Sequence, residues 1–198
     1  NIAACIVIGI EPKWTERIVK EIAKTGKPVA GFHIERYGDL RTIERASRKA
    51  KEFVQYATEL RREPFPINKL VMSTKCGESD TTTGLSSCPT VGRVFERLTK
   101  AGATMIFGET SELTGGEDII QSRCVNRRVL AGFNAMFEDY TNLIKSQGVD
   151  LLGSQPTEGN IRGGLTTIEE KAMGNIQKIG RCEVQSVLEP AVEPRGKG

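Results

Sequence analysis

Residues 69–84 read KLVMSTKCGESDTTTG and contain the change of pattern that decides the fold. The stretch begins with an apolar run of strand length and continues, over residues 74–84, with a thiol, two carboxylates, a lysine and several hydroxyls. A helical pattern opened by Pro89 follows it. In an open α/β sheet, ligands bind in the crevice beyond the carboxyl ends of the strands. The stretch therefore predicts a strand, a polar site at its end and a helix behind it.

Strand and helix patterns alternate from the N-terminus to residue 110. The first strand pattern, residues 3–10, is a continuous apolar run, which is typical of a strand covered on both faces. Further strand patterns occupy residues 28–34, 69–76 and 103–107, and amphipathic helical patterns occupy residues 14–24, 40–62 and 91–98. This alternation predicts an α/β fold, a three-layer Rossmann-like domain with a mainly parallel sheet.

A helical C-terminal part follows the alternating region. Residues 112–124 and 127–146 have helical spacing with no strand pattern between them, and a loop over 148–164 leads to a last helix capped by Thr166 and Thr167. We expect one α/β catalytic-core domain over residues 1–188. It consists of strand and helix alternation over 1–110, a helical part over 111–147, and a glycine-rich loop with its helix over 148–180. We expect residues 189–198 to form a linker. The start within a strand, without a methionine, predicts a piece of a longer protein.

The composition excludes several classes of protein. The 198 residues carry 28 basic and 25 acidic side chains, and the net charge of +3 is too small to indicate a nucleic-acid partner. Five cysteines without CxxC spacing favour reduced thiols and a cytoplasmic protein. No apolar run approaches the roughly 20 residues of a membrane span, so we expect no membrane partner.

Polar residues gather in three clusters at predicted element ends, over residues 75–80, 109–112 and 159–164. Neighbouring parallel strands would bring the first two clusters to one sheet edge and form a pocket from Lys75, Glu78, Asp80, Glu109 and Glu112. Carboxylate oxygens suit magnesium, manganese or ferrous iron, and a Cys76 thiolate would favour iron or zinc. The glycine-rich third cluster could hold an anion at a helix N-terminus, but it lacks the Lys-Ser/Thr ending of a nucleotide-binding P-loop.

Structural roles remain open for the same residues. Ser79 and Asp80 could cap a turn, Glu112 could favour a helix N-terminus, and Cys76 could be a small core residue. The single histidine, His33, ends the second strand pattern and has the features of a structural residue. Three clusters at converging element ends nevertheless favour a binding or catalytic site.

Three stretches resemble the altronate and galactarate dehydratase family. They are TKCGESDTTTGLSSCPTVG at 74–92, GATMIFGETSELTGGED at 102–118 and PTEGNIRGGLTTIEEKAMGNIQKIG at 156–180. VIGIEP and KTGKPVAGF in the opening third are similar to the sulfolactate sulfo-lyase branch, and to its large subunit in particular. Sugar-acid members commonly read CGGSD where residues 76–80 read CGESD, as sulfo-lyase-like members do. Cys88 departs from the family, which usually has an asparagine there.

The resemblance implies a lyase of carbohydrate-acid metabolism that converts a small anionic 2-hydroxy acid to a 2-keto acid. It favours sulfolactate giving pyruvate and sulfite, with an altronate- or galactarate-type hydro-lyase as the alternative. It also implies a divalent metal, Fe²⁺ above Mn²⁺ or Mg²⁺, a small N-terminal domain or separate small subunit, and a homo-oligomer. Without that partner the chain alone could be inactive.

The resemblance further implies roles for individual residues. The proposed acid and base residues are Lys75, Glu78 and Asp80. The proposed metal ligands are Cys76, Asp80, Glu109 and Glu112. The proposed substrate-binding residues are Ser79, Thr110, Asn160, Arg162, Gly163, Gly164 and Thr167. A non-catalytic module that binds a small acid or a partner subunit through these clusters is the competing hypothesis.

Overall fold

The computed structural model describes residues 2–190 and 192–194, and it divides into two compact units, Asn1–Pro64 and Phe65–Gly198. The sequence predicts one domain over 1–188, whereas the contacts separate at an extended segment that contains Pro64 and Pro66. Of the predicted linker, residues 191 and 195–198 lie outside the described residues. No helix in the described ranges is both long and apolar enough to span a membrane.

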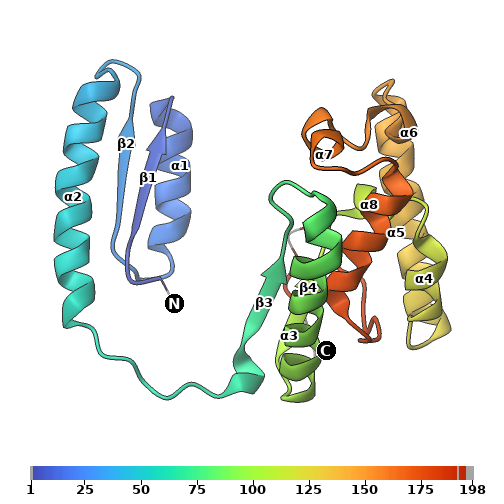
Figure 1. The fold of residues 1–198 in the computed structure, drawn as a ribbon. Coiled ribbons are helices and arrows are strands. Elements are labelled where there is room, and N and C mark those ends of the chain that lie inside the picture. The colour runs from blue at the N-terminus through green and yellow to red at the C-terminus, as the bar shows by residue number, and fades with distance from the viewer. Residues whose placement is uncertain (1, 191, 195–198) are drawn as a thin grey trace. The chain divides into compact units, whose positions relative to one another are not determined.

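The first unit is a βαβ motif followed by a long helix (Figure 1). It contains β1 (Cys5–Gly9), α1 (Pro12–Ala23), β2 (Val29–His33) and α2 (Asp39–Glu59). The two strands are parallel, with Cys5 opposite Val29 and Gly9 opposite His33. Pro12 begins α1, where its missing N–H is not needed. All four elements lie where the hydrophobic pattern predicts them.

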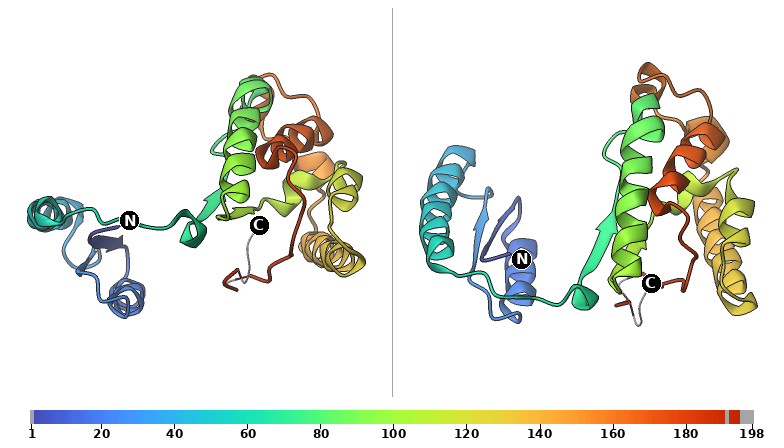
Figure 2. Two further views of the ribbon diagram at one scale, coloured as in Figure 1. Left: turned by 90° about the horizontal axis from the view of Figure 1, so that it is seen from below. Right: turned by 60° about the horizontal axis from the view of Figure 1, so that its bottom comes forward.

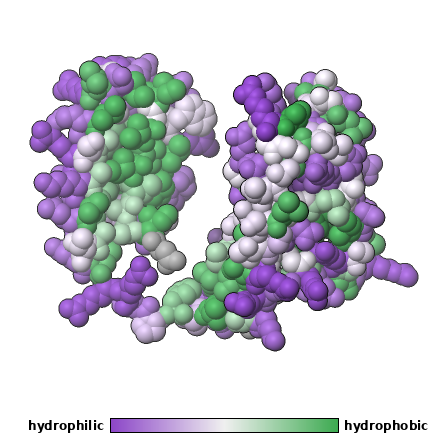
Figure 3. Space-filling model, in the orientation of Figure 1, coloured by the Kyte–Doolittle hydropathy of each residue, from purple (hydrophilic) through white to green (hydrophobic). Residues whose placement is uncertain are grey.

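One face of the first unit is apolar and exposed. Ile8, Ile43 and Val54 are 56%, 58% and 62% exposed. Figure 3 shows hydrophobic residues gathered over β1 and β2, between the two helices. The strand over residues 3–10 was expected to be covered on both faces. The expectation was wrong within this unit, because a two-stranded sheet with two helices leaves part of its apolar surface open.

The second unit contains the other pair of parallel strands. β3 (Val71–Thr74) pairs with β4 (Thr104–Phe107), and Thr74 lies opposite Phe107 at their carboxyl ends. The residues after the two strands therefore begin side by side. The α/β class and the parallel pairing are confirmed, but the single three-layer Rossmann-like sheet is not. The described residues form two separate two-stranded sheets, and Val71 on β3 is 54% exposed.

Helices supply most of the second unit. They are α3 (Cys88–Lys100), α4 (Glu117–Ser122), α5 (Arg127–Ser146), α6 (Leu151–Ser154), α7 (Glu158–Arg162) and α8 (Ile168–Ile176), with 3₁₀ turns η1 (Ile67–Lys69), η3 (Thr110–Leu113) and η4 (Gln177–Ile179) and a π-helical turn η2 (Thr83–Ser87). The predicted helix over 112–124 is interrupted, because Gly115 has φ 85° between η3 and α4. The predicted loop over 148–164 contains α6 and α7, which are too short for a periodic pattern.

The core of the second unit joins α3, α4, α5 and the α8–η4 segment. Its buried side chains are Phe95, Leu113, Ile120, Val129, Phe133, Ile176, Ile179 and Val184. A close backbone crossing brings α3 against η4, since a Cβ atom on Gly92 would lie 2.3 Å from the Gln177 carbonyl oxygen. Figure 2 shows α3 and α8 side by side. This packing fixes α8 and η4 beside the ends of β3 and β4.

Candidate active site

Glu109 is a buried carboxylate that follows β4. Its backbone is left-handed, with φ 71° and ψ 54°, a conformation that costs a non-glycine residue about 1–3 kcal/mol. The carboxylate forms ion pairs with Lys75 and Lys178 and accepts a hydrogen bond from the Cys76 backbone N–H at 3.2 Å. Burial would raise the pKa of Glu109, but Lys178, Lys75 and the Cys76 N–H lower that pKa overall. The carboxylate is therefore ionised and held by three donors.

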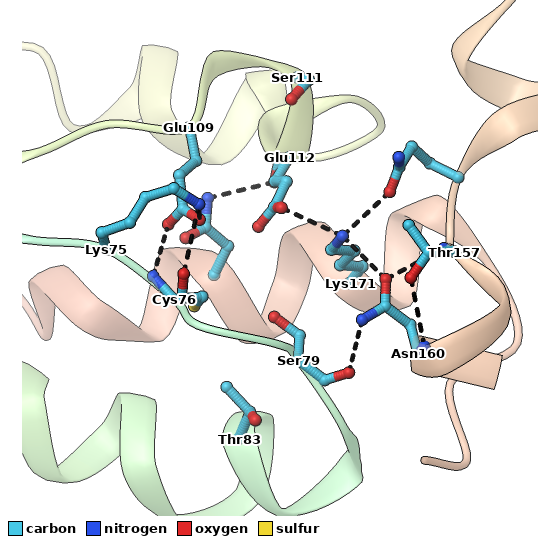
Figure 4. Close-up of polar contacts among 12 residues, drawn as sticks. Lys75, Cys76, Ser79, Thr83, Glu109, Ser111, Glu112, Thr157, Asn160 and Lys171 are labelled. Carbon is cyan, nitrogen blue, oxygen red and sulfur yellow. Dashed lines mark hydrogen bonds and ion pairs between the residues drawn. The ribbon is translucent and has the colours of Figure 1, made fainter. Parts of the chain in front are cut away.

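Glu112 lies in η3, one turn after Glu109. Its Oε1 atom is 3.0 Å from the Lys171 Nζ atom, and its Oε2 atom is buried without a hydrogen-bond partner among the described residues. Lys171 also donates to Gln155 Oε1 and Asn160 Oδ1, at 3.0 Å each. Figure 4 shows Lys171 between Glu112 and Asn160. Three acceptors thus fix Lys171, which in turn orients Glu112.

Cys76 follows β3 and faces a second thiol. Its Sγ atom lies 4.0 Å from the Sγ atom of Cys88, the first residue of α3. The Cys88 thiol and the Lys178 ammonium lower the pKa of Cys76 to about 6 against the opposing effect of burial. The interaction with Cys76 and burial raise the pKa of Cys88. At neutral pH Cys76 is therefore a thiolate and Cys88 a neutral thiol.

Cys76, Glu109 and Glu112 fit a divalent cation. One ligand atom of each residue lies within 4.8 Å of the others, a separation that a single ion with ligands at about 2.0–2.4 Å can bridge. The unpartnered Glu112 Oε2 atom supports this fit, because a buried carboxylate oxygen is rarely left without a donor or an ion. Lys75 and Lys178 supply positive charge to Glu109 in the structure, so a cation there would displace or share their contacts.

Glu78 and Asp80 lie outside this cluster, whereas the Ser79 side chain interacts with the Cys76 thiol and helps to lower its pKa. Asp80 Oδ1 accepts hydrogen bonds from the Thr83 N–H at 2.8 Å and from the hydroxyls of Thr82 and Thr83. It thereby caps a helical backbone that runs from residue 81 through η2 into α3. Ser79 is buried, and its carbonyl oxygen accepts from Asn160 Nδ2 at 2.7 Å. The structure thus gives Ser79 and Asp80 contacts that stabilise the loop.

The glycine-rich cluster packs against residues 78–81. Gly159 lies within α7, and a Cβ atom there would meet the Glu78 carboxylate at 1.8 Å. A Cβ atom on Gly163 would lie 2.6 Å from that of Asp80, and the Thr81 N–H donates to the Gly163 carbonyl oxygen at 3.1 Å. The sequence predicts an anion cradle here. The close approach of two loops accounts for the glycines, and the anion cradle stays a prediction.

The remaining predicted substrate-binding residues are scattered. Asn160 is 2% exposed and bonds within the capping box of Thr157. Arg162 is exposed and pairs with Glu158, and Thr167 caps α8 by accepting from the Glu170 N–H. Thr110 lines a largely apolar cavity of about 410 Å³ behind β4. Of these four side chains, Asn160 is linked to the cluster of Cys76, Glu109 and Glu112 through Lys171, which contacts both Asn160 and Glu112.

A second cavity, of about 430 Å³, opens beside Lys171. Its lining includes Ser79, Asp80, Thr81, Lys171 and Asn175. Asn175 donates from Nδ2 to the Glu112 carbonyl oxygen at 3.3 Å, and its Oδ1 atom is buried without a partner in the described structure. The Asn175 Oδ1 atom can accept a hydrogen bond from a ligand hydroxyl group. The three protons of the Lys171 ammonium are already taken by Gln155, Asn160 and Glu112, so Lys171 would attract a small anionic ligand by its charge rather than by a further hydrogen bond.

Three residues of this site, Lys171, Asn175 and Lys178, were absent from the sequence-based assignment. They are 7%, 2% and 2% exposed, and each contacts Glu109 or Glu112. Their spacing of four and three residues places them on one face of the α8–η4 segment. Their helical spacing is visible in the sequence, but it does not show that these polar side chains are buried.

Two family descriptions cover most of the chain. Residues 67–198 match "D-galactarate/Altronate dehydratase, C-terminal", and residues 1–58 match "D-galactarate dehydratase/Altronate hydrolase, second domain". The chain belongs to the D-galactarate/altronate dehydratase family. The boundary between the two matches falls where the contacts divide the structure into two units.

Curated relatives in this family are lyases. The (2R)-sulfolactate sulfo-lyase subunit beta of Chromohalobacter salexigens is 60% identical over 200 residues, which cover 100% of this chain and 51% of the relative. Galactarate dehydratase (L-threo-forming) of Escherichia coli is 32% identical, covering 75% of this chain and 28% of the relative. Altronate dehydratase of Bacillus subtilis is 30% identical, with 75% and 30% covered. The chain therefore spans about half or less of these relatives.

Proposed function

We propose that this chain carries the metal-binding core of a lyase that eliminates sulfite from sulfolactate and yields pyruvate. The observation that carries the metal-dependent part is the buried, unpartnered Glu112 Oε2 atom beside Cys76 and Glu109. The 60% identity to a sulfolactate sulfo-lyase subunit beta supports the choice of substrate. Elimination of water from a sugar acid is the second candidate, supported by the two dehydratases at 32% and 30% identity.

The reaction requires removal of the proton from the carbon that bears the hydroxyl and carboxylate groups. Loss of sulfite from the neighbouring carbon then gives an enol, which tautomerises to the keto acid. A divalent metal, with Fe²⁺ favoured over Mn²⁺ or Mg²⁺, would act as a Lewis acid toward the hydroxyl and carboxylate oxygens. Cys76, Glu109 and Glu112 are the residues that would hold it.

Lys75 is the proposed acid, which would return a proton to the terminal carbon of the enol as it becomes the keto acid. Its side chain is 70% exposed at the edge of the cluster, whereas Lys178 is buried and fixed. The ion pair with Glu109 raises the pKa of Lys75, so its Nζ atom holds a proton while the pair persists. Glu78, the alternative, faces Gly159 and lies outside the metal-binding cluster. The cavity beside Lys171 and Asn175 is the proposed space for the substrate.

The partner requirement is also a proposal. The relative is named as a subunit beta, which supports a complete enzyme assembled from this polypeptide and a separate small subunit. A homo-oligomer and a cytoplasmic location remain predictions from the sequence. The competing function is a non-catalytic module in which the same site holds a small acid.

Product analysis on the assembled enzyme tests the proposal. The assembly, loaded with Fe²⁺ under anaerobic conditions, should release sulfite and pyruvate in equal amounts from sulfolactate and little keto acid from altronate or galactarate. Keto acid from a sugar acid alone would favour the hydro-lyase. Binding of sulfolactate without any product would favour the non-catalytic module.

The matched variants are E112Q and E138Q. Glu112 contributes the unpartnered carboxylate oxygen, and Glu138 is an exposed carboxylate on α5. We expect E112Q to lower kcat by at least about 100-fold, a loss of about 2.7 kcal/mol of transition-state stabilisation, and E138Q to leave it unchanged.

A further inference from the structure

Cys88 is a buried thiol for which the proposed reaction has no use. It is 3% exposed, and its Sγ atom lies 4.0 Å from that of Cys76. The other cysteines of the second unit have oxygen neighbours instead. Cys124 Sγ is 3.4 Å from the Ile120 carbonyl oxygen, and Cys182 Sγ is 3.9 Å from the Thr99 hydroxyl. The pairing of two sulfur atoms is thus specific to Cys76 and Cys88 among the described cysteines.

The two sulfur atoms need only a small approach to bond. A disulfide has an S–S distance of about 2.05 Å, so the gap of 4.0 Å closes by about 2 Å. Cys88 is fixed in the first turn of α3, whereas Cys76 lies in the loop between β3 and the helix cap at Asp80. The neighbouring Gly77 has open space where a side chain would lie, so the loop can move there without a clash.

We propose that Cys76 and Cys88 are a modification site at which a peroxide forms a reversible disulfide. This inference rests on the proposed function only where it concerns metal binding. Cys76 is a candidate ligand of the metal-binding cluster, so disulfide formation would withdraw its sulfur and leave Glu109 and Glu112. The disulfide itself depends only on the paired thiols, so the metal-free protein suffices to test it.

The chemistry has two steps. The Cys76 thiolate attacks hydrogen peroxide, an S–O bond forms, the O–O bond breaks, and hydroxide leaves and takes up a proton as water. Cys88 sulfur then attacks the Cys76 sulfenic acid, an S–S bond forms, and the S–O bond breaks with release of a second water. Overall, two thiols are oxidised by two electrons and one peroxide is reduced to two waters.

Burial decides which cysteine reacts first. Cys76 is half-buried and Cys88 almost completely buried, so peroxide reaches Cys76 while Cys88 acts as the resolving thiol. A resolving thiol at this distance captures the sulfenic acid before a second peroxide can oxidise it further. Without Cys88, Cys76 should proceed to the irreversible sulfinic acid.

Peptide mass spectrometry of the full chain tests this inference. The wild-type protein is treated with hydrogen peroxide, its free thiols are blocked, and it is digested without a reductant. We expect a linked peptide pair that joins Cys76 to Cys88 and disappears after dithiothreitol. C88S, which keeps a small polar side chain, should give no linked pair and should accumulate sulfinic acid at Cys76 at least about fivefold faster than wild type. Cys124 and Cys182 provide internal controls in the same digest.

Two results would overturn the inference. One is sulfinic acid at Cys76 that forms equally fast in wild type and C88S, with no linked pair. The other is a linkage that joins either thiol to Cys124 or Cys182 as often as to its proposed partner.

Manganese titration of the oxidised protein separates this inference from the proposed function. Loss of Mn²⁺ binding on oxidation, restored by dithiothreitol in wild type, supports the disulfide and the metal site together. A linked pair in a protein that never binds Mn²⁺ supports the disulfide and contradicts the metal site.

Discussion

Glu109 is a buried carboxylate that pairs with two lysines, Lys75 and Lys178. Its left-handed backbone and its buried carboxylate are both unfavourable in isolation. Lys178, which is only 2% exposed, forms an ion pair with the carboxylate and so offsets the cost of burying its charge. Removing one member of a buried ion pair leaves an uncompensated charge, which typically costs about 3–5 kcal/mol. We therefore expect K178M to lower the free energy of unfolding by about 3 kcal/mol, measured by urea denaturation.

K75M is the matched control for that experiment. Lys75 pairs with the same carboxylate, but its side chain is 70% exposed, so its contribution should be below about 1 kcal/mol. If the two variants proved equally stable, Lys178 would not have the structural role assigned to it.

The Cys76 thiol should titrate below neutral pH. An ordinary thiol has a pKa of about 8.5, whereas Cys88 and Lys178 lower that of Cys76 to about 6. Because only the thiolate is alkylated, the rate at Cys76 in the metal-free protein should rise through pH 6 and level off near neutral pH. Iodoacetamide labelling followed by peptide mass spectrometry measures this rate. C88A should move the midpoint to higher pH, and a rate that still rises between pH 8 and 9 would contradict the assignment.

Some of these residues could be predicted from the sequence, and the reason is geometric. Cys76 and Glu109 follow neighbouring parallel strands, so their proximity follows from strand pairing alone. Lys171 and Lys178 could not be found in this way, because charged residues on an amphipathic helix are usually solvated. Only the packing of α8 and η4 against η3 and α3 shows that they are buried.

At the scale of elements, the crossing of α3 with η4 positions Lys178. A Cβ atom on Gly92 would meet the Gln177 carbonyl oxygen at 2.3 Å and the Gly180 N atom at 2.8 Å, and neither backbone atom can move freely. We expect G92A to lower the free energy of unfolding by about 1–3 kcal/mol and to lower the melting temperature. The helix-interior control is G132A, whose Cβ atom would meet Val187 at an ordinary 3.7 Å.

G132A should leave stability unchanged or raise it by up to about 1 kcal/mol, since alanine favours a helix over glycine. Equal melting temperatures for G92A and G132A would show that the crossing is looser than described. Differential scanning calorimetry of both variants gives the comparison directly.

Element boundaries explain where the sequence-based reading failed. Cys88 stands where the family usually has an asparagine, and cysteine is a poorer helix cap than asparagine. The helical backbone instead begins at residue 81 with Asp80 as its cap, so Cys88 lies inside it and needs no capping side chain. The π-helical turn η2 between them has no sequence pattern of its own. Cap geometry and close packing at glycines depend on tertiary contacts, and the hydrophobic periodicity of the sequence does not predict these contacts.

At the scale of the whole chain, all the candidate metal ligands belong to the second unit. Arg61 and Arg62 lie in the exposed extended segment between the units. Limited trypsin digestion should therefore cut there first and yield two fragments that resist further cleavage. Gel electrophoresis and mass spectrometry over a time course identify the cut. Early cleavage within α5 or α8 instead would contradict the division into units.

The number of domains could not be derived from the pattern, because alternation of strands and helices does not say which strands pair. Four strand patterns in sequence are compatible with one four-stranded sheet or with two separate pairs. Pro64 and Pro66 follow the helical pattern over 40–62, and they lie at the boundary between the units.

The most direct test of a metal-binding core is calorimetric titration of Mn²⁺ into the wild-type chain, E112Q and E138Q. We expect one Mn²⁺ bound per wild-type chain, unchanged binding in E138Q, and at least about tenfold weaker binding in E112Q, about 1.4 kcal/mol. This result would follow from the loss of the unpartnered carboxylate oxygen beside Cys76 and Glu109. E112Q that binds Mn²⁺ as tightly as wild type, or a wild-type chain that binds none, would contradict it.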